Sequence, residues 1–105
     1  MNVIFIEDDP MNRRVVGDML NVAGATMTEA ESGEIGLRLI DENDFDMALI
    51  DLRMPGMDGI TAIDLRERCL AAGADEVLFK PVAMDALFDA IGRVLALRGD
   101  GGMML

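Results

Sequence analysis

The chain contains no histidine, tryptophan or tyrosine, and it has one cysteine among its 105 residues. Without histidine it can supply neither a Ser-His-Asp triad nor a phosphohistidine, and a zinc site is not expected. One cysteine cannot form an internal disulfide, which favours a reducing, cytoplasmic location. No apolar run approaches the ~18 residues of a membrane span, and the N-terminus lacks the basic and long apolar segments of a secretory signal. We therefore expect no membrane partner.

Positive charge is scarce. Lysine and arginine number 9 against 20 aspartates and glutamates, so the net charge is −11. Such a surface repels phosphate backbones, and we expect no nucleic-acid partner. Apolar residues make up 51% of the chain, which is typical of a folded domain. The length suits one domain, expected over residues 1–98, with residues 99–105 as a flexible tail.

Short apolar runs alternate with amphipathic segments along the chain. The runs predict strands at residues 3–6, 26–30, 47–50 and 76–79. The segments between and after them predict helices that begin near Pro10, Ser32, Asp58 and Met84. The order βαβαβαβα predicts an α/β fold, in which a parallel sheet is flanked by helices.

The first and last predicted helices each carry an apolar stripe. In the first helix the stripe includes Val15 and Val16, while Arg13 and Arg14 are expected in solvent. The stripe of the last helix comprises Met84, Leu87, Phe88, Ile91, Val94 and Leu95. A narrow sheet would leave part of this second stripe uncovered.

Charged side chains follow three of the predicted strands. Glu7, Asp8 and Asp9 follow the first strand, Asp51 the third and Lys80 the fourth. Taken singly, each would be an ordinary surface charge. The C-terminal ends of parallel strands meet at one edge, however, where carboxylates can bind Mg²⁺ and a lysine can bind a phosphoryl oxygen. Since a carboxylate can also act as a nucleophile, this edge predicts phosphoryl transfer to an aspartate.

Four segments of the sequence together resemble the receiver domain of two-component response regulators. They are IFIEDD (residues 4–9), DLRMPGMDG (51–59), AAGAD (71–75) and KP (80–81). They occur in the family's order and span most of the chain, and the segment around residue 51 is the most specific of them. The resemblance implies a flavodoxin-like fold and a cytoplasmic phosphorelay protein.

The resemblance also implies a role for each charged residue. Asp51 would accept a phosphoryl group from the phosphohistidine of a sensor histidine kinase or a histidine phosphotransfer protein. Asp8 would join Asp51 in binding Mg²⁺ directly, and Glu7 would act through water. The backbone carbonyl of Arg53 would complete the metal site, which leaves its side chain free to vary. Lys80 would pair with the phosphoryl oxygens. Asp9 lies where the family does not require an acid.

The middle of the chain is shorter than the family requires. The 29 residues from Asp51 to Lys80 accommodate one loop, one helix and one strand. The family has five strands, so we expect four strands here, in the order 2-1-3-4. The family's phosphoryl-binding Ser or Thr ends the missing strand, and Thr61 instead fits the first turn of a helix. The family's aromatic switch position falls on Val77, which cannot make the ring movement.

Two functional hypotheses follow. The first is a stand-alone, Mg²⁺-dependent phospho-acceptor, with self-phosphorylation and self-dephosphorylation at Asp51 rather than conventional enzyme activity. The second is a phosphorylation-independent receiver-like module for interaction or dimerisation, favoured by the missing strand and hydroxyl. A free-standing hydrolase is disfavoured, because the sequence offers no evident general base beyond the acids.

An open sheet edge and a partly uncovered helix predict a homodimer through the last strand and the final helix.

Overall fold

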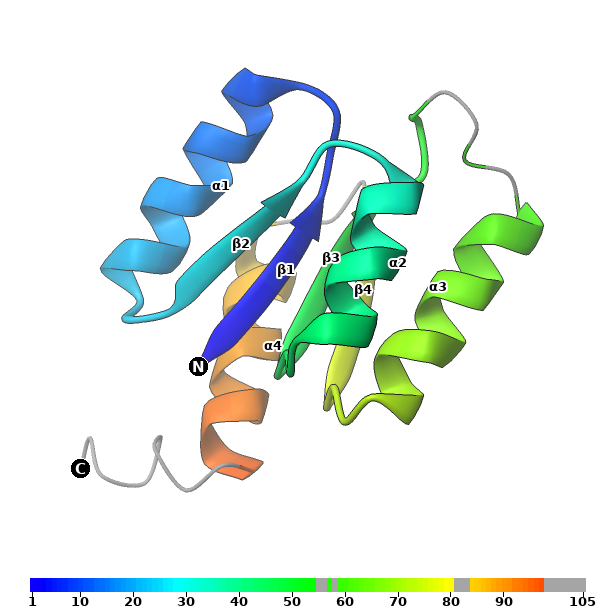
Figure 1. The fold of residues 1–105 in the computed structure, drawn as a ribbon. Helices are drawn as coiled ribbons and strands as arrows, with labels where there is room; N and C mark the ends of the chain where they lie inside the picture. The colour runs from blue at the N-terminus through cyan, green and yellow to red at the C-terminus, as the bar shows by residue number, and fades with distance from the viewer. Residues whose placement is uncertain (55–56, 58, 81–83, 98–105) are drawn as a thin grey trace.

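The chain folds into alternating strands and helices (Figure 1). The structure, a computed structural model, describes residues 1–54, 57, 59–80 and 84–97. The elements in chain order are β1 (Asn2–Ile6), α1 (Pro10–Val22), β2 (Thr26–Ala30), α2 (Gly33–Glu42), β3 (Met47–Asp51), α3 (Gly59–Ala71), β4 (Glu76–Lys80) and α4 (Met84–Leu97). The expected order βαβαβαβα is confirmed. The expected tail at residues 99–105 lies outside the described residues.

The strands form one parallel sheet in the order β2-β1-β3-β4. This confirms the four-strand order expected from the short middle of the chain. The two central strands, β1 and β3, are the most apolar and are almost fully buried. β4 pairs with β3 on one side and forms an edge of the sheet, so its residues are half-buried.

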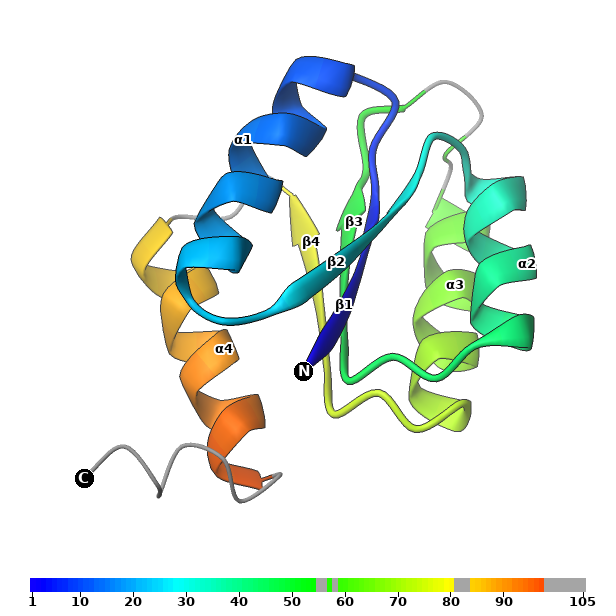
Figure 2. The ribbon, with the colours of Figure 1, turned by 60° about the vertical axis from the view of Figure 1, so that its left-hand side comes forward.

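Helices cover both faces of the sheet (Figure 2). α1 and α4 cover one face, and α2 and α3 cover the other. Alternate residues of β1 point to opposite faces: Val3 and Phe5 contact the α1/α4 side, whereas Ile4 and Ile6 contact the α2/α3 side. The chain leaves β1 toward β2 on one side and returns to β3 on the other, so the direction of winding reverses at β1. Ligands of such sheets bind at this reversal, beyond the C-terminal ends of the strands.

Local signals in the sequence explain where helices begin and end. The side chain of Asp9 accepts a hydrogen bond from the backbone N–H of Met11 and caps α1, so Asp9 is more than a loop charge. Ser32 caps α2, as expected. Gly24 follows α1 and Gly73 follows α3, with φ of 83° and 105°, a conformation that glycine adopts without strain. The cap expected at Asp58 lies outside the described residues.

Three expectations about the helix faces need correction or completion. Val15 is 53% exposed, because α1 packs on the sheet through Val16 and Leu20, one turn apart. The buried face of α1 is thus narrower than the apolar stripe in its sequence. The Arg13 side chain, expected in solvent, is only 15% exposed. In α4, Leu87, Ile91 and Val94 are buried and Phe88 is 44% exposed. The side chains of Met84 and Leu95 lie outside the described set.

Within the part of the chain that the structure describes, no helix has both the length and the hydropathy that crossing a bilayer requires.

Candidate functional site

Three charged side chains meet on one face of the sheet at its C-terminal edge. The register pairs Ile6 with Ile50 and Asp51 with Lys80, so Glu7 follows directly beside Asp51. Side chains alternate along a strand, and Glu7, Asp51 and Lys80 therefore continue the rows that face α1 and α4. The strand ends thus bring together two acids and one lysine that are distant in the sequence.

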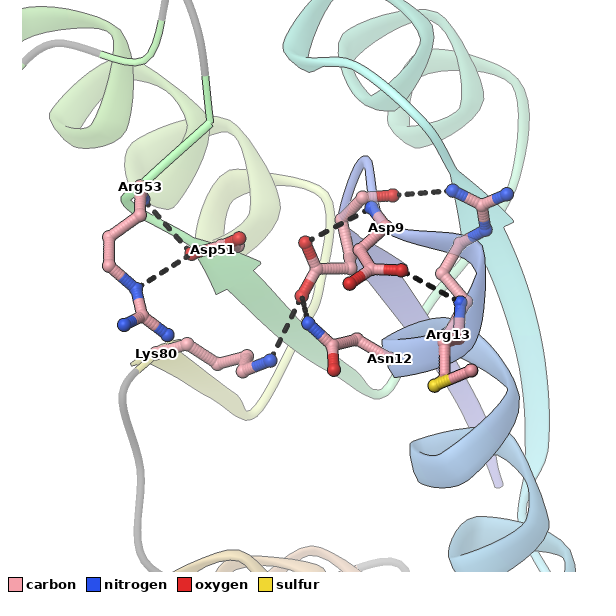
Figure 3. Close-up of polar contacts among 8 residues, drawn as sticks. Asp9, Asn12, Arg13, Asp51, Arg53 and Lys80 are labelled. Carbon is pink, nitrogen blue, oxygen red and sulfur yellow. Dashed lines mark hydrogen bonds and ion pairs between the residues drawn. The ribbon is translucent and has the colours of Figure 1, made fainter.

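Glu7 is the most deeply buried of these charges, with 1% of its surface exposed. Its Oε1 accepts hydrogen bonds from Lys80 Nζ at 2.9 Å and from Asn12 Nδ2 at 3.2 Å (Figure 3). The Lys80 ammonium also lies 5.4 Å from the centre of the Phe5 ring, a cation–π contact. The buried carboxylate is thereby paired and hydrogen-bonded, as a buried charge must be.

Asp51 is 5% exposed and lies at the end of β3. Its Oδ1 accepts a hydrogen bond from the backbone N–H of Arg53 at 2.9 Å, and the Arg53 Nε lies 3.9 Å from the same oxygen. The Arg53 side chain is 69% exposed and folds back toward Asp51 (Figure 3). The carboxylate is therefore buried on the sheet side and accompanied by a guanidinium on the solvent side.

The two acids have pKa values that move in opposite directions. Burial acts to raise the pKa of Glu7, but hydrogen bonding with Asp51, Lys80 and the backbone N–H of Asp9 outweighs burial and lowers that pKa to about 2. Burial raises the pKa of Asp51, and the neighbouring Glu7 raises it further. An added cation would therefore stabilise the ionised form of Asp51 more than that of Glu7, which is already paired with Lys80.

Asp8 completes a group of three acids with Glu7 and Asp51. One carboxylate oxygen from each lies within 4.8 Å of the others. Asp8 is exposed, whereas the other two are buried, so the group opens to solvent on the Asp8 side. Oxygen-only ligands of this kind fit Mg²⁺, which retains several waters and is usually held by one or two carboxylates.

The two remaining site candidates lie elsewhere. Thr61 is in the first turn of α3, where its methyl group would lie 3.8 Å from a Cβ at Gly33 of α2. Val77 points to the opposite face of the sheet from Lys80 and packs among the α2/α3 side chains. The expected helical position of Thr61 is confirmed, and neither residue lies among the charges at the strand ends.

Two contacts at the site could not be inferred from the sequence patterns. Asn12 donates to Glu7, as described above, and Arg13 Nη1 donates to the Glu7 backbone carbonyl at 2.8 Å. Arg13 Nε also lies 3.8 Å from Glu29, so this side chain links the ends of β1 and β2. Pro10 is the sequence feature that could have indicated these contacts. A helix that begins at Pro10 places its first turn, with Asn12 and Arg13, beside the end of β1.

Known proteins resemble this chain in sequence and in fold. Sensor histidine kinase RcsC of Salmonella typhi is 34% identical over 108 residues, which cover 83% of this chain and 11% of the kinase. The chain therefore spans about a tenth of that relative's length. Among solved structures, the receiver domain of the hybrid histidine kinase CckA is 26% identical with a TM-score of 0.70, over 90% of this chain and 99% of that domain.

A second solved structure holds a metal ion. The receiver domain of sensor histidine kinase PA1611 from Pseudomonas aeruginosa, with magnesium coordinated in its active site cleft, is 25% identical, with a TM-score of 0.67 over 90% of this chain and 97% of that one. Residues 3–67 match the family described as the response regulator receiver domain. That match includes β1, β3 and all three acids and covers more than half of the chain. The chain therefore belongs to the response regulator receiver domain family.

Proposed function

We propose that Asp51 accepts a phosphoryl group from a phosphohistidine on a partner protein, in a reaction that requires Mg²⁺. The observation that carries the proposal is the position of Asp51 at the end of β3, within 4.8 Å of Glu7 and Asp8 ligand atoms and in register with Lys80. The chain is a receiver domain, and its relatives include sensor histidine kinases. Acidic, metal-binding edges of this kind support phosphoryl transfer to a carboxylate.

In the proposed reaction, a carboxylate oxygen of Asp51 attacks the phosphorus of the phosphohistidine. The phosphorus–nitrogen bond breaks, and the departing imidazole nitrogen takes the electron pair and then a proton. Asp51 becomes an acyl phosphate. Hydrolysis of the acyl phosphate restores the free carboxylate. A water oxygen attacks the phosphorus, the bond to the Asp51 oxygen breaks, and inorganic phosphate is released.

The residues that would hold Mg²⁺ are Asp8 and Asp51 directly, Glu7 through water, and the backbone carbonyl of Arg53. Glu7 suits an indirect contact because Lys80 and Asn12 already bind its Oε1. When bound, the ion supplies positive charge that offsets the repulsion between the phosphoryl oxygens and the acids. Lys80 would add a point charge to the phosphoryl oxygens.

Intact-mass spectrometry after incubation with acetyl phosphate and Mg²⁺ tests the proposal. We expect one acid-labile phosphoryl adduct on the wild-type chain. Asp51→Asn should not form it, since an amide is a poor nucleophile, and EDTA should prevent it in the wild type. Equal yields in the wild type and Asp51→Asn would refute the assignment of Asp51.

We also propose a homodimer through β4 and α4. β4 is an edge strand whose residues are half-buried, and Phe88 on α4 is 44% exposed. Light scattering coupled to gel filtration should give the mass of two chains at high micromolar concentration, and a strict monomer would contradict the proposal. A dimer in a chain that does not accept phosphoryl groups would instead favour the phosphorylation-independent module.

The cytoplasmic location stays a prediction from the sequence.

A further inference from the structure

The Arg53 side chain is the most accessible cation beside the phosphoacceptor. It is 69% exposed, and its contact with Asp51 Oδ1 is a long one, 3.9 Å from Nε. Its backbone is fixed by contrast, because the Arg53 N–H donates to the same oxygen at 2.9 Å. The guanidinium is therefore exposed and loosely paired, while the Arg53 backbone is held beside Asp51. The family resemblance implied only a role for the Arg53 backbone carbonyl and left its side chain free to vary.

Lys80, a second cation at this edge, is already engaged. Its Nζ binds Glu7 Oε1 at 2.9 Å, and its side chain is only 16% exposed. Moving Lys80 fully onto a new group would leave Glu7, 1% exposed, without its cation. Removing one partner of a buried ion pair is costly. Lys80 can therefore share its charge with a phosphoryl group but cannot be transferred to it without loss.

A phosphoryl group on Asp51 would add about −1.5 to −2 charges and three acceptor oxygens at this position. A guanidinium suits such a group, because its planar fork of N–H donors matches two phosphoryl oxygens at once. The Arg53 guanidinium needs only a small movement from its present position, and no described ion pair other than that with Asp51 opposes it. Its contact with the Asp51 carboxylate would be replaced by a stronger one.

Building on the proposed function, we propose that the Arg53 guanidinium binds the phosphoryl oxygens on Asp51 and speeds phosphoryl transfer to it. Arg53 then has two separate parts at the site, a backbone that holds Asp51 and a side chain that binds the incoming group. Lys80 keeps Glu7 paired and adds its charge to the phosphoryl group. The exposed cation would thus bind the added phosphoryl group, and the buried cation would stay with the buried acid.

The test compares rate constants for phosphorylation by acetyl phosphate with saturating Mg²⁺. Arg53→Ala should be about tenfold slower than the wild type, the equivalent of about 1.4 kcal/mol for a charge-assisted contact at an exposed site. Arg53→Lys, which keeps the charge but loses the fork, should fall between the two. Arg66→Ala is the matched control, because Arg66 is an exposed arginine on α3 and its loss changes the net charge equally. It should stay within about twofold of the wild type.

A second readout separates phosphoryl binding from general damage to the site. Beryllofluoride, which mimics a phosphoryl group, should bind more weakly to Arg53→Ala, whereas Mg²⁺ alone should bind as well or better, because a cation near the acids is gone. Equal weakening of both ligands would make Arg53 a structural residue and overturn the inference. So would an Arg53→Ala rate equal to that of Arg66→Ala. In either case the proposed function stands if Asp51→Asn abolishes the adduct, and it fails on its own if the wild type forms none.

Discussion

At the scale of single residues, the buried acids Glu7 and Asp51 make opposite contributions to stability. The pKa of Asp51 is raised by burial and by Glu7, so the ionised form of Asp51 costs folding free energy at neutral pH. Asp51→Asn should therefore raise the free energy of unfolding at neutral pH, because the asparagine amide carries no charge. The gain should shrink as the pH falls through the pKa of Asp51, because the wild-type carboxyl is then neutral too.

Urea unfolding of the wild type and Asp51→Asn across this pH range measures the effect. Asp44→Asn is the control, since Asp44 is an exposed acid away from the strand ends. It should leave the free energy of unfolding within about 0.5 kcal/mol at every pH. A neutral-pH gain no larger than that of the control would contradict the account of Asp51.

Glu7 should show the reverse behaviour. Its pKa falls from 4.5 to about 2, so its contribution to stability is complete above pH 4.5 and is lost as the pH drops toward 2. Glu7→Gln should lower the free energy of unfolding by about 2 kcal/mol at neutral pH, because Lys80 loses its anion. The difference between the two proteins should close below that pH window. A constant difference at all pH values would mean that the loss comes from packing instead of charge.

At the scale of elements, the approach of α2 to the sheet depends on one glycine. A Cβ at Gly36 would lie 2.5 Å from Cδ1 and 3.0 Å from Cγ1 of Ile6, a fully buried residue of β1. Gly36→Ala should therefore destabilise the protein by about 1–3 kcal/mol, the usual cost of overpacking a core. Thermal unfolding monitored by circular dichroism would measure the change.

Two other helical glycines serve as controls. A Cβ at Gly17 of α1 would meet the flexible end of Met27 at 2.8 Å, and one at Gly92 of α4 would meet no atom within 4 Å. Gly92→Ala should stabilise by about 0.5–1 kcal/mol through helix propensity, and Gly17→Ala should have little net effect. If Gly36→Ala were as stable as Gly92→Ala, the close approach of α2 to β1 would not hold in solution.

The elements were predictable because their signals are local. Apolar runs indicate the strands. The cap at Ser32 indicates where a helix begins, and the glycines after α1 and α3 indicate where those helices end. The faces of the helices were less predictable. The apolar stripe of a helix does not reveal how much of that stripe the neighbouring elements cover. Val15 was therefore expected in the core, but it is 53% exposed. For the same reason Arg13 was expected in solvent, although its side chain contacts the Glu7 carbonyl and Glu29.

At the scale of the whole molecule, the shortened sheet preserves the site. β4 pairs directly with β3, so Lys80 lies opposite Asp51 although the sheet formed by the described residues has four strands. This was predictable because chain length limits how many crossovers fit between the two residues. The side-chain contacts of Asn12 and Arg53 could not be predicted in this way. They depend on how α1 and the residues after β3 lie once the sheet has formed.

The same charge distribution predicts a response to Mg²⁺ of the whole domain. The net charge is −11, so any salt should stabilise the fold somewhat by screening. Mg²⁺ should raise the melting temperature by several degrees beyond NaCl at equal ionic strength, since a ligand at a hundredfold excess over its Kd adds about 2.7 kcal/mol. Asp8→Asn should remove most of that excess. Equal effects of the two salts on the wild type would argue against a bound ion.

Reductive trapping tests the central claim, phosphoryl acceptance by Asp51, most directly. Borohydride reduces an aspartyl phosphate to homoserine, which tandem mass spectrometry can locate in a peptide. After treatment with acetyl phosphate, Mg²⁺ and borohydride, we expect homoserine at residue 51, and no reduced residue in Asp51→Asn. A reduced residue at Glu7 or Asp8, or unmodified aspartate at 51 in a chain that gained a phosphoryl mass, would contradict the account.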